Sequence, residues 1–192
     1  MAQTAAESYS KMAEFYPTLK TQYTAPKPIF FSKFMSEINL TGIFFSATFE
    51  ANVNVASPAF LIPSTMCHEL SHVQGYMRED EANYISYLVC SLSDDEYFQY
   101  SGTMLAFIHA GNALYSVDNE AYFKIYDLLS DKAKADINAN NSYWQSFKGK
   151  AAEVSKKVND TYLKINSQEE GVKSYGRMVD LLLADYKIKK LN

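Results

Sequence analysis

Two histidines four residues apart, with a glutamate directly after the first, constrain this chain more than any other feature. His68, Glu69 and His72 stand in the pentapeptide His-Glu-Leu-Ser-His. Residues four apart lie one above the other on a helix face, so both imidazoles can reach one metal ion while Glu69 points at its open side. The surrounding segment has the pattern of a helix that runs to about Gly75, and Ser64 or Thr65 can cap its start.

The pentapeptide has the form H-E-x-x-H, which is typical of zinc peptidases, and a catalytic zinc takes three protein ligands and a water. Acidic side chains that could supply the third ligand follow within a few residues. On a helix Glu79 shares a face with Asn83, whereas Asp80 and Glu81 point elsewhere, toward solvent or Arg78. We therefore expect Glu79 to be the third ligand. Asn83 is expected to accept a hydrogen bond from the outer nitrogen of a liganding histidine.

Glu69 is the candidate catalytic residue, because a zinc-bound water has a pKa near 7 and a neighbouring carboxylate can accept its proton. The competing interpretation is a chance match on an amphipathic helix whose histidines are satisfied in the core. The chain contains three histidines. The third, His109, lies among apolar residues, and we expect it to be a packed core histidine.

Composition narrows the class of protein. With 192 residues and 47% apolar content, the chain is long enough for one folded domain with a sizeable core. Its net charge of −4 argues against nucleic acid and against an anionic membrane surface as partners. No apolar run has the length of a membrane span. Cys67 and Cys90 are too few for a disulfide scaffold, and we expect buried free thiols.

The chain pattern predicts a mainly helical α+β fold, with a single domain over 1–192 and an N-terminal helical lead-in over 1–25. Residues 43–55 are rich in Phe, Val and Thr and partly alternate, which predicts one or two strands before the motif helix. Ser93 to Glu96 has the pattern of a helix start. Helices are expected near 2–16, 78–92, 93–116, 119–129, 131–138, 150–165 and 173–188.

With these residues in view, the chain resembles an uncharacterised bacterial family of membrane-anchored, predicted zinc metallopeptidases that is classified as a domain of unknown function. The resemblance covers most of the chain from about Pro26 onward. It implies a protein whose N-terminal membrane spans are absent from this chain, which would be its soluble portion at a bacterial membrane. The segments that carry the resemblance are 41–45, 50–54, 67–72, 78–83, 157–160 and 173–180.

More distantly, H-E-x-x-H followed by E-x-x-A-[DN] is similar to the gluzincin pattern. This similarity implies a zincin-like helical domain, with Glu79 as ligand and Asn83 behind a histidine. Many gluzincins carry Asp where this chain has Asn83, and a neutral partner should raise histidine basicity less. In gluzincin-like folds the strand before the motif helix pairs with extended substrate, and residues 51–55 have the corresponding place in the chain.

Five further residues are candidates for substrate contact or catalysis. Glu50, Asn52 and Asn54 could orient substrate, and the alternative is the solvated polar face of a half-buried strand. Tyr175 and Arg177 could stabilise the oxyanion, because phenol and guanidinium donors suit developing negative charge. For these two the alternative is helix capping and surface pairing.

The sequence thus predicts a zinc metallopeptidase, a hydrolase that cleaves peptide or protein substrates with a Zn²⁺-bound water activated by Glu69. The alternative from a different class is a catalytically inactive zinc-binding domain, serving as the sensor or scaffold of a membrane protein. A third possibility is a helical interaction domain without a metal.

Overall fold

The computed structural model describes residues 1–19, 24–149 and 177–191, and most of them are helical. This confirms the predicted class, a mainly α domain with a small β element before the motif helix. The elements are α1 (Ala2–Phe15), η1 (Pro17–Leu19), β1 (Lys27–Pro28), α2 (Ser32–Glu37), β2 (Gly42–Phe45), β3 (Glu50–Val53), η2 (Ala59–Leu61), α3 (Ile62–Val73), α4 (Glu79–Ser91), α5 (Glu96–Val117), α6 (Asn119–Asp127), α7 (Asp131–Ser146) and α9 (Arg177–Leu191).

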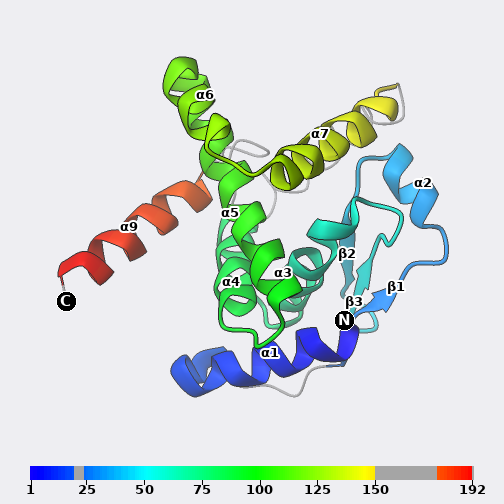
Figure 1. The fold of residues 1–192 in the computed structure, drawn as a ribbon. Helices are drawn as coiled ribbons and strands as arrows, with labels where there is room; N and C mark the ends of the chain where they lie inside the picture. Colours follow the sequence, from blue (N-terminus) through cyan, green and yellow to red (C-terminus); the bar gives the residue numbers. More distant parts are fainter. Residues whose placement is uncertain (20–23, 150–176, 192) are drawn as a thin grey trace.

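Helix α3 carries the pentapeptide and is packed on several sides. It contacts the sheet through β2 and β3, and it contacts α4 and α5 on the side away from the sheet (Figure 1). α9 packs against α4 and α5, whereas α6 contacts the end of α5 and has no buried residue. Because neighbours surround α3, its side chains are held in place before any ligand binds.

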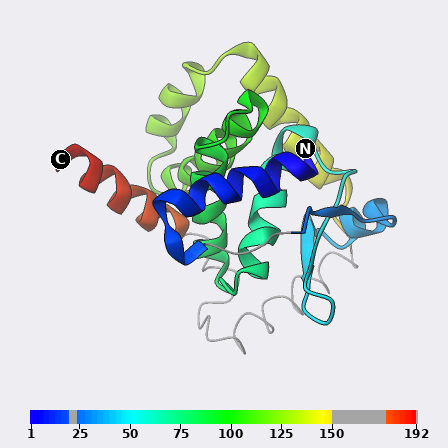
Figure 2. The ribbon, with the colours of Figure 1, turned by 90° about the horizontal axis from the view of Figure 1, so that it is seen from below.

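The N-terminal helix α1 belongs to the main core and is more than a lead-in. It lies across the helical layer, as Figure 2 shows, and contacts α3 and α4. Tyr9 is fully buried, and its hydroxyl donates to the carbonyl of Cys67 at 2.7 Å and also bonds the hydroxyl of Ser71. Ala5 and Met12 are buried beside it. α1 therefore braces the rear of the motif helix.

The sheet has three strands in the order β1-β3-β2, with β1 parallel and β2 antiparallel to β3. The predicted strand region 43–55 is thus a hairpin, and its turn contains Phe49 at a positive φ of 54°. β3 is paired on both sides. The expectation that residues 51–55 offer a free edge to substrate is therefore wrong, because β3 is the central strand and the edges of the sheet are β1 and β2.

Several helix boundaries depart from the predicted ones. α3 begins at Ile62, before the expected cap, and the Ser64 hydroxyl donates to the carbonyl of Leu61 at 2.9 Å instead of capping the helix. Asp95 caps α5 by accepting from the N–H of Tyr97 at 2.8 Å, as the acidic start predicted. α7 continues to Ser146, beyond the predicted end at 138. The helix predicted at 150–165 lies outside the described residues.

Candidate metal centre

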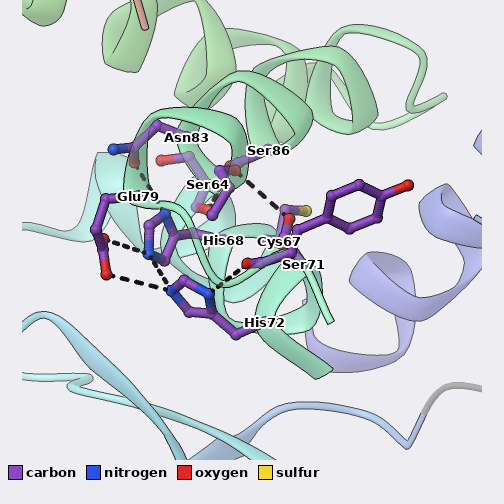
Figure 3. Close-up of polar contacts among 10 residues, drawn as sticks. Ser64, Cys67, His68, Ser71, His72, Glu79, Asn83 and Ser86 are labelled. Atoms are coloured by element: carbon purple, nitrogen blue, oxygen red, sulfur yellow. Dashed lines mark hydrogen bonds and ion pairs between the residues drawn. The ribbon is translucent and has the colours of Figure 1, made fainter. Parts of the chain in front are cut away.

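Three side chains from two helices converge at one point, as Figure 3 shows. Nε2 of His68 lies 3.0 Å from Nε2 of His72, and both point at the carboxylate of Glu79, at 3.3 and 3.6 Å respectively. One ligand atom from each residue lies within 4.8 Å of the other two. Around a tetrahedral zinc with bonds of about 2.0–2.1 Å, neighbouring ligand atoms lie ~3.3 Å apart. The three side chains fit such an ion in number, type and spacing.

The chain brings Glu79 back to the histidines by a short reversal. α3 ends at Val73, and Gly75 has a φ of 92°, which a side chain would strain. α4 then starts at Glu79, and Ala82 is fully buried against α3, so the two helices approach closely. The expected reversal after Gly75 and the choice of Glu79 over its acidic neighbours are consistent with this geometry.

Asp80 and Glu81 are directed away from the histidines, toward Arg78. Asp80 is buried, and it accepts from the guanidinium at 2.9 Å, while Glu81 pairs with the same group at 3.4 Å. Of the three neighbouring acids, two therefore hold the arginine and the first faces the histidines.

Each histidine is oriented by a hydrogen bond at its outer nitrogen. Nδ1 of His68 lies 2.9 Å from Oδ1 of Asn83, as predicted, and Nδ1 of His72 lies 2.8 Å from the carbonyl of Tyr76. An amide oxygen and a carbonyl only accept, so in both rings Nδ1 carries the hydrogen. When such a ring is neutral, it presents its Nε2 lone pair to the central point, as a metal ligand must.

Electrostatics distinguish the two imidazoles in the metal-free protein. Burial lowers the pKa of His68, but its hydrogen bond to Glu79 and the charge of that carboxylate outweigh burial and raise the pKa to about 9. Burial and the charge of His68 lower the pKa of His72 to about 4. At neutral pH the two imidazoles therefore share one proton beyond the hydrogen on each Nδ1. A divalent cation would displace this additional proton.

Glu69 is buried beside the three convergent side chains. Its pKa rises to about 8, first because of burial and against the lowering effect of the His68 charge. It accepts a backbone hydrogen bond from Phe44, while its Oε2 is buried without a hydrogen-bond partner in the described structure. Buried polar atoms normally have partners, so this oxygen fits a site that holds a further group, such as a metal-bound water.

A cavity of about 260 Å³ opens beside the convergent side chains, with His68, Glu79 and Asn83 in its wall. α5 contributes His109, which lines this cavity and is only partly buried, less than the packed core position that the sequence suggested. α7 contributes Trp144, which sequence reasoning missed because nothing local relates residue 144 to the pentapeptide.

The polar residues of β3, and Asn54 directly after it, are not brought to the cavity. Glu50 pairs with Lys27, and the amide of Asn52 donates to the carbonyl of Glu50 at 3.1 Å. Asn54 is fully buried, where its amide donates to Ser36 and Leu40, each at 2.9 Å. The predicted substrate-orienting role is therefore wrong for Asn54, which fastens the sheet to α2. Neither Glu50 nor Asn52 lines the cavity.

Of the two oxyanion candidates, Arg177 is the first residue of α9, is exposed and does not line the cavity. Tyr175 lies outside the described residues.

Cys67 and Cys90 are buried free thiols, as expected, with their sulfur atoms 3.7 Å apart. In the described part of the chain, no helix combines the length and the apolar character needed to cross a bilayer.

Comparison with known proteins gives one match. No curated protein and no solved structure matches this chain. A family model described as protein of unknown function (DUF3810) matches residues 1–183. Since the match covers nearly all of the sequence, the chain belongs to this family of proteins of unknown function.

Proposed function

We propose that this protein is a zinc-dependent metallopeptidase, with His68, His72 and Glu79 as metal ligands and Glu69 as the catalytic base. The family match carries no activity, so the proposal depends on the site geometry. The observation that supports it most is the convergence of two Nε2 atoms and a carboxylate beside a buried glutamate with an unpartnered oxygen.

Each residue around the proposed metal position has a different role in peptide hydrolysis. A bound zinc would acidify a water and polarise the scissile carbonyl. Glu69 accepts a proton from the attacking water and delivers it to the departing amine. Burial raises the pKa of Glu69 to about 8 in the metal-free protein, and the charge of a bound zinc would lower it again, so that the carboxylate can accept the proton. Asn83 and the carbonyl of Tyr76 keep both imidazoles in the ligating tautomer.

Strand β2 supplies a surface along which an extended peptide can align. It is an edge strand, and its side away from β3 borders the candidate site, because the N–H of Phe44 bonds Glu69. Gly42 also lies directly against Glu69. Backbone pairing along such an edge is a common way to hold extended peptides. In this proposal β2 replaces β3 as the strand that receives substrate.

The test compares wild-type protein with Glu69→Gln, which keeps the side chain's size and removes its basicity. Both proteins are loaded with one zinc and incubated with a mixed peptide library, and the products are identified by mass spectrometry. We expect cleavage by the wild type, a loss of about 10²–10⁴-fold in the variant, and equal zinc content. Glu81→Gln, which changes a half-buried acid on α4 that pairs with Arg78, is the matched control and should cleave normally.

A zinc-loaded wild type that leaves every peptide intact would refute the peptidase proposal. Zinc binding without cleavage would then favour the inactive sensor or scaffold. A Glu69→Gln protein as active as the wild type would equally remove Glu69 from the mechanism.

A further inference from the structure

We propose that the cavity beside the metal centre receives one bulky, uncharged side chain of the substrate, next to the scissile bond. This assignment rests on the proposed function, since a side-chain pocket requires a peptide held at the metal. His68 and Glu79 form part of the cavity wall. A group bound by their ligand atoms therefore stands at the cavity, and its neighbouring side chain can enter directly.

The chemistry of the walls selects against charge. Leu61, Leu105, Ile108 and Trp144 form much of the lining. Apart from His68, Glu79 and His109, the described lining residues have no ionisable side chain, and the first two are the proposed metal ligands. An ammonium would find no acid in the described lining other than the proposed ligand Glu79, and a carboxylate would find only His109 beyond the ligands, whereas an apolar side chain would gain by leaving water.

The volume of the cavity indicates how large the bound substrate side chain can be. Water occupies about 30 Å³ per molecule, so the cavity of about 260 Å³ has room for eight or nine water-sized groups. The seven carbons of a phenylalanine side chain, or the four of a leucine, fit this space. Glycine or alanine would leave most of the cavity to water. The pocket therefore favours large apolar residues over small ones.

The far wall of the cavity is held in place before substrate binds. The indole N–H of Trp144 donates to Oδ1 of Asn140 at 3.1 Å, and Asn140 also lines the cavity. The adjacent Tyr143 bonds the hydroxyl of Ser36, which in turn accepts from the amide of Asn54 at 2.9 Å. This chain of bonds fixes α7 to α2 and the sheet. A wall fixed in this way costs little ordering on binding.

Hydroxamates of single amino acids test the pocket without requiring catalysis, because the hydroxamate group binds zinc directly. The zinc-loaded protein is titrated calorimetrically with the hydroxamates of glycine, leucine, phenylalanine and glutamate. We expect leucine and phenylalanine to bind at least about tenfold more tightly than glycine, and glutamate to gain nothing over glycine. Trp144 is the single tryptophan of the chain, so its fluorescence should change with the two apolar ligands.

Two variants localise the effect. Leu105→Trp fills the cavity from α5 and should remove the preference for leucine and phenylalanine while glycine hydroxamate still binds. Val117→Trp makes the same change at an exposed site of the same helix and should leave all affinities unchanged. If Leu105→Trp fails to fold, Trp144→Ala opens the opposite wall and should weaken leucine binding about tenfold relative to glycine.

The outcomes separate the two proposals. Equal affinity for all four hydroxamates, or tightest binding of glutamate, would overturn the pocket assignment and leave the metal centre intact. A zinc-loaded protein that binds none of them would have no exchangeable position on its metal, which overturns the proposed function and the pocket with it.

Discussion

Gly42 lies so close to the side chain of Glu69 that any side chain at position 42 would displace the glutamate. A Cβ atom placed there would lie 2.7 Å from Cγ and 2.8 Å from Cδ of the glutamate. Two neighbouring elements of the fold, β2 and α3, thus meet at the proposed catalytic base. The N–H of Phe44, two residues along the same strand, bonds the same carboxylate. The strand therefore positions the base from one side.

The first prediction concerns this contact. Gly42→Ala should displace the Glu69 carboxylate, because pairing with β3 holds the strand in place and the glutamate side chain moves more easily. Peptide cleavage should fall by about 10²-fold, since displacements of about 1 Å at a reacting group have effects of this size. Zinc content should stay at the wild-type level. Gly149→Ala, where a Cβ would meet nothing within 4 Å, is the control; unchanged cleavage by Gly42→Ala would contradict the contact's role.

The second prediction concerns the third ligand. Glu79→Ala should weaken zinc binding by more than about 100-fold. Removing a residue that only hydrogen-bonds to a metal ligand typically costs about 10–100-fold in affinity. Glu81→Ala should bind zinc normally, because its carboxylate faces Arg78. Asp80→Ala should also keep zinc but lose stability, since it leaves Arg78 without its buried partner. Competition with a chromogenic chelator measures all three affinities, and equal losses across them would refute the assignment.

The third prediction concerns the residue behind His68. Asn83→Ala should weaken zinc binding by about 10–100-fold, because His68 loses the acceptor that fixes its tautomer. Asn83→Asp should bind zinc at least as tightly as the wild type, since a carboxylate acceptor raises the basicity of the ring. The same chelator competition distinguishes the two variants. Wild-type affinity in Asn83→Ala would show that the hydrogen bond has no role in ligation.

The fourth prediction concerns the brace from α1. Tyr9→Phe should lower the free energy of unfolding by about 1–3 kcal/mol, because the carbonyl of Cys67 and the hydroxyl of Ser71 lose a buried partner. Urea denaturation measures this loss. Tyr16→Phe removes a hydroxyl from a residue that is 46% exposed and should change stability little. Equal stability in both variants would contradict the bracing role.

The fifth prediction concerns protons released on metal binding. With a pKa raised to about 9, His68 carries a proton at pH 7 in the metal-free protein, and a zinc ligand must be deprotonated. Zinc binding at pH 7 should therefore release at least one proton, and affinity should rise as pH increases toward 9. Calorimetry in buffers of different ionisation enthalpy counts these protons. A count of zero would exclude a protonated His68.

The convergence of the proposed ligands could be predicted from sequence because helical periodicity relates nearby residues. The spacing of His68 and His72 places both rings on one face, and the same periodicity on α4 separates Glu79 and Asn83 from the neighbouring acids. Each of these relationships is local. The structure accordingly agrees with the sequence at all four positions.

The rest of the site depends on contacts between distant segments. β1 consists of two residues, Lys27–Pro28, and its pairing with β3 has no local signal, so the pattern of residues 51–55 cannot reveal that β3 is a central strand. Asn54 looks like a surface residue in an alternating strand, but α2 covers it. His109 and Trp144 reach the cavity only because α5 packs against α3 and α7 packs against α5 and η2. Periodicity within one segment cannot predict these positions.

The central claim is that two imidazoles and one carboxylate bind a single zinc with an exchangeable water. Metal analysis and X-ray absorption spectroscopy on protein dialysed against zinc and freed of excess metal test it most directly. We predict one zinc per chain, with two nitrogen and two oxygen neighbours at about 2.0–2.2 Å, and no bound zinc in a His68→Ala, His72→Ala double variant. A wild-type protein that does not bind zinc, or a double variant that binds it equally well, would contradict the proposed metal centre.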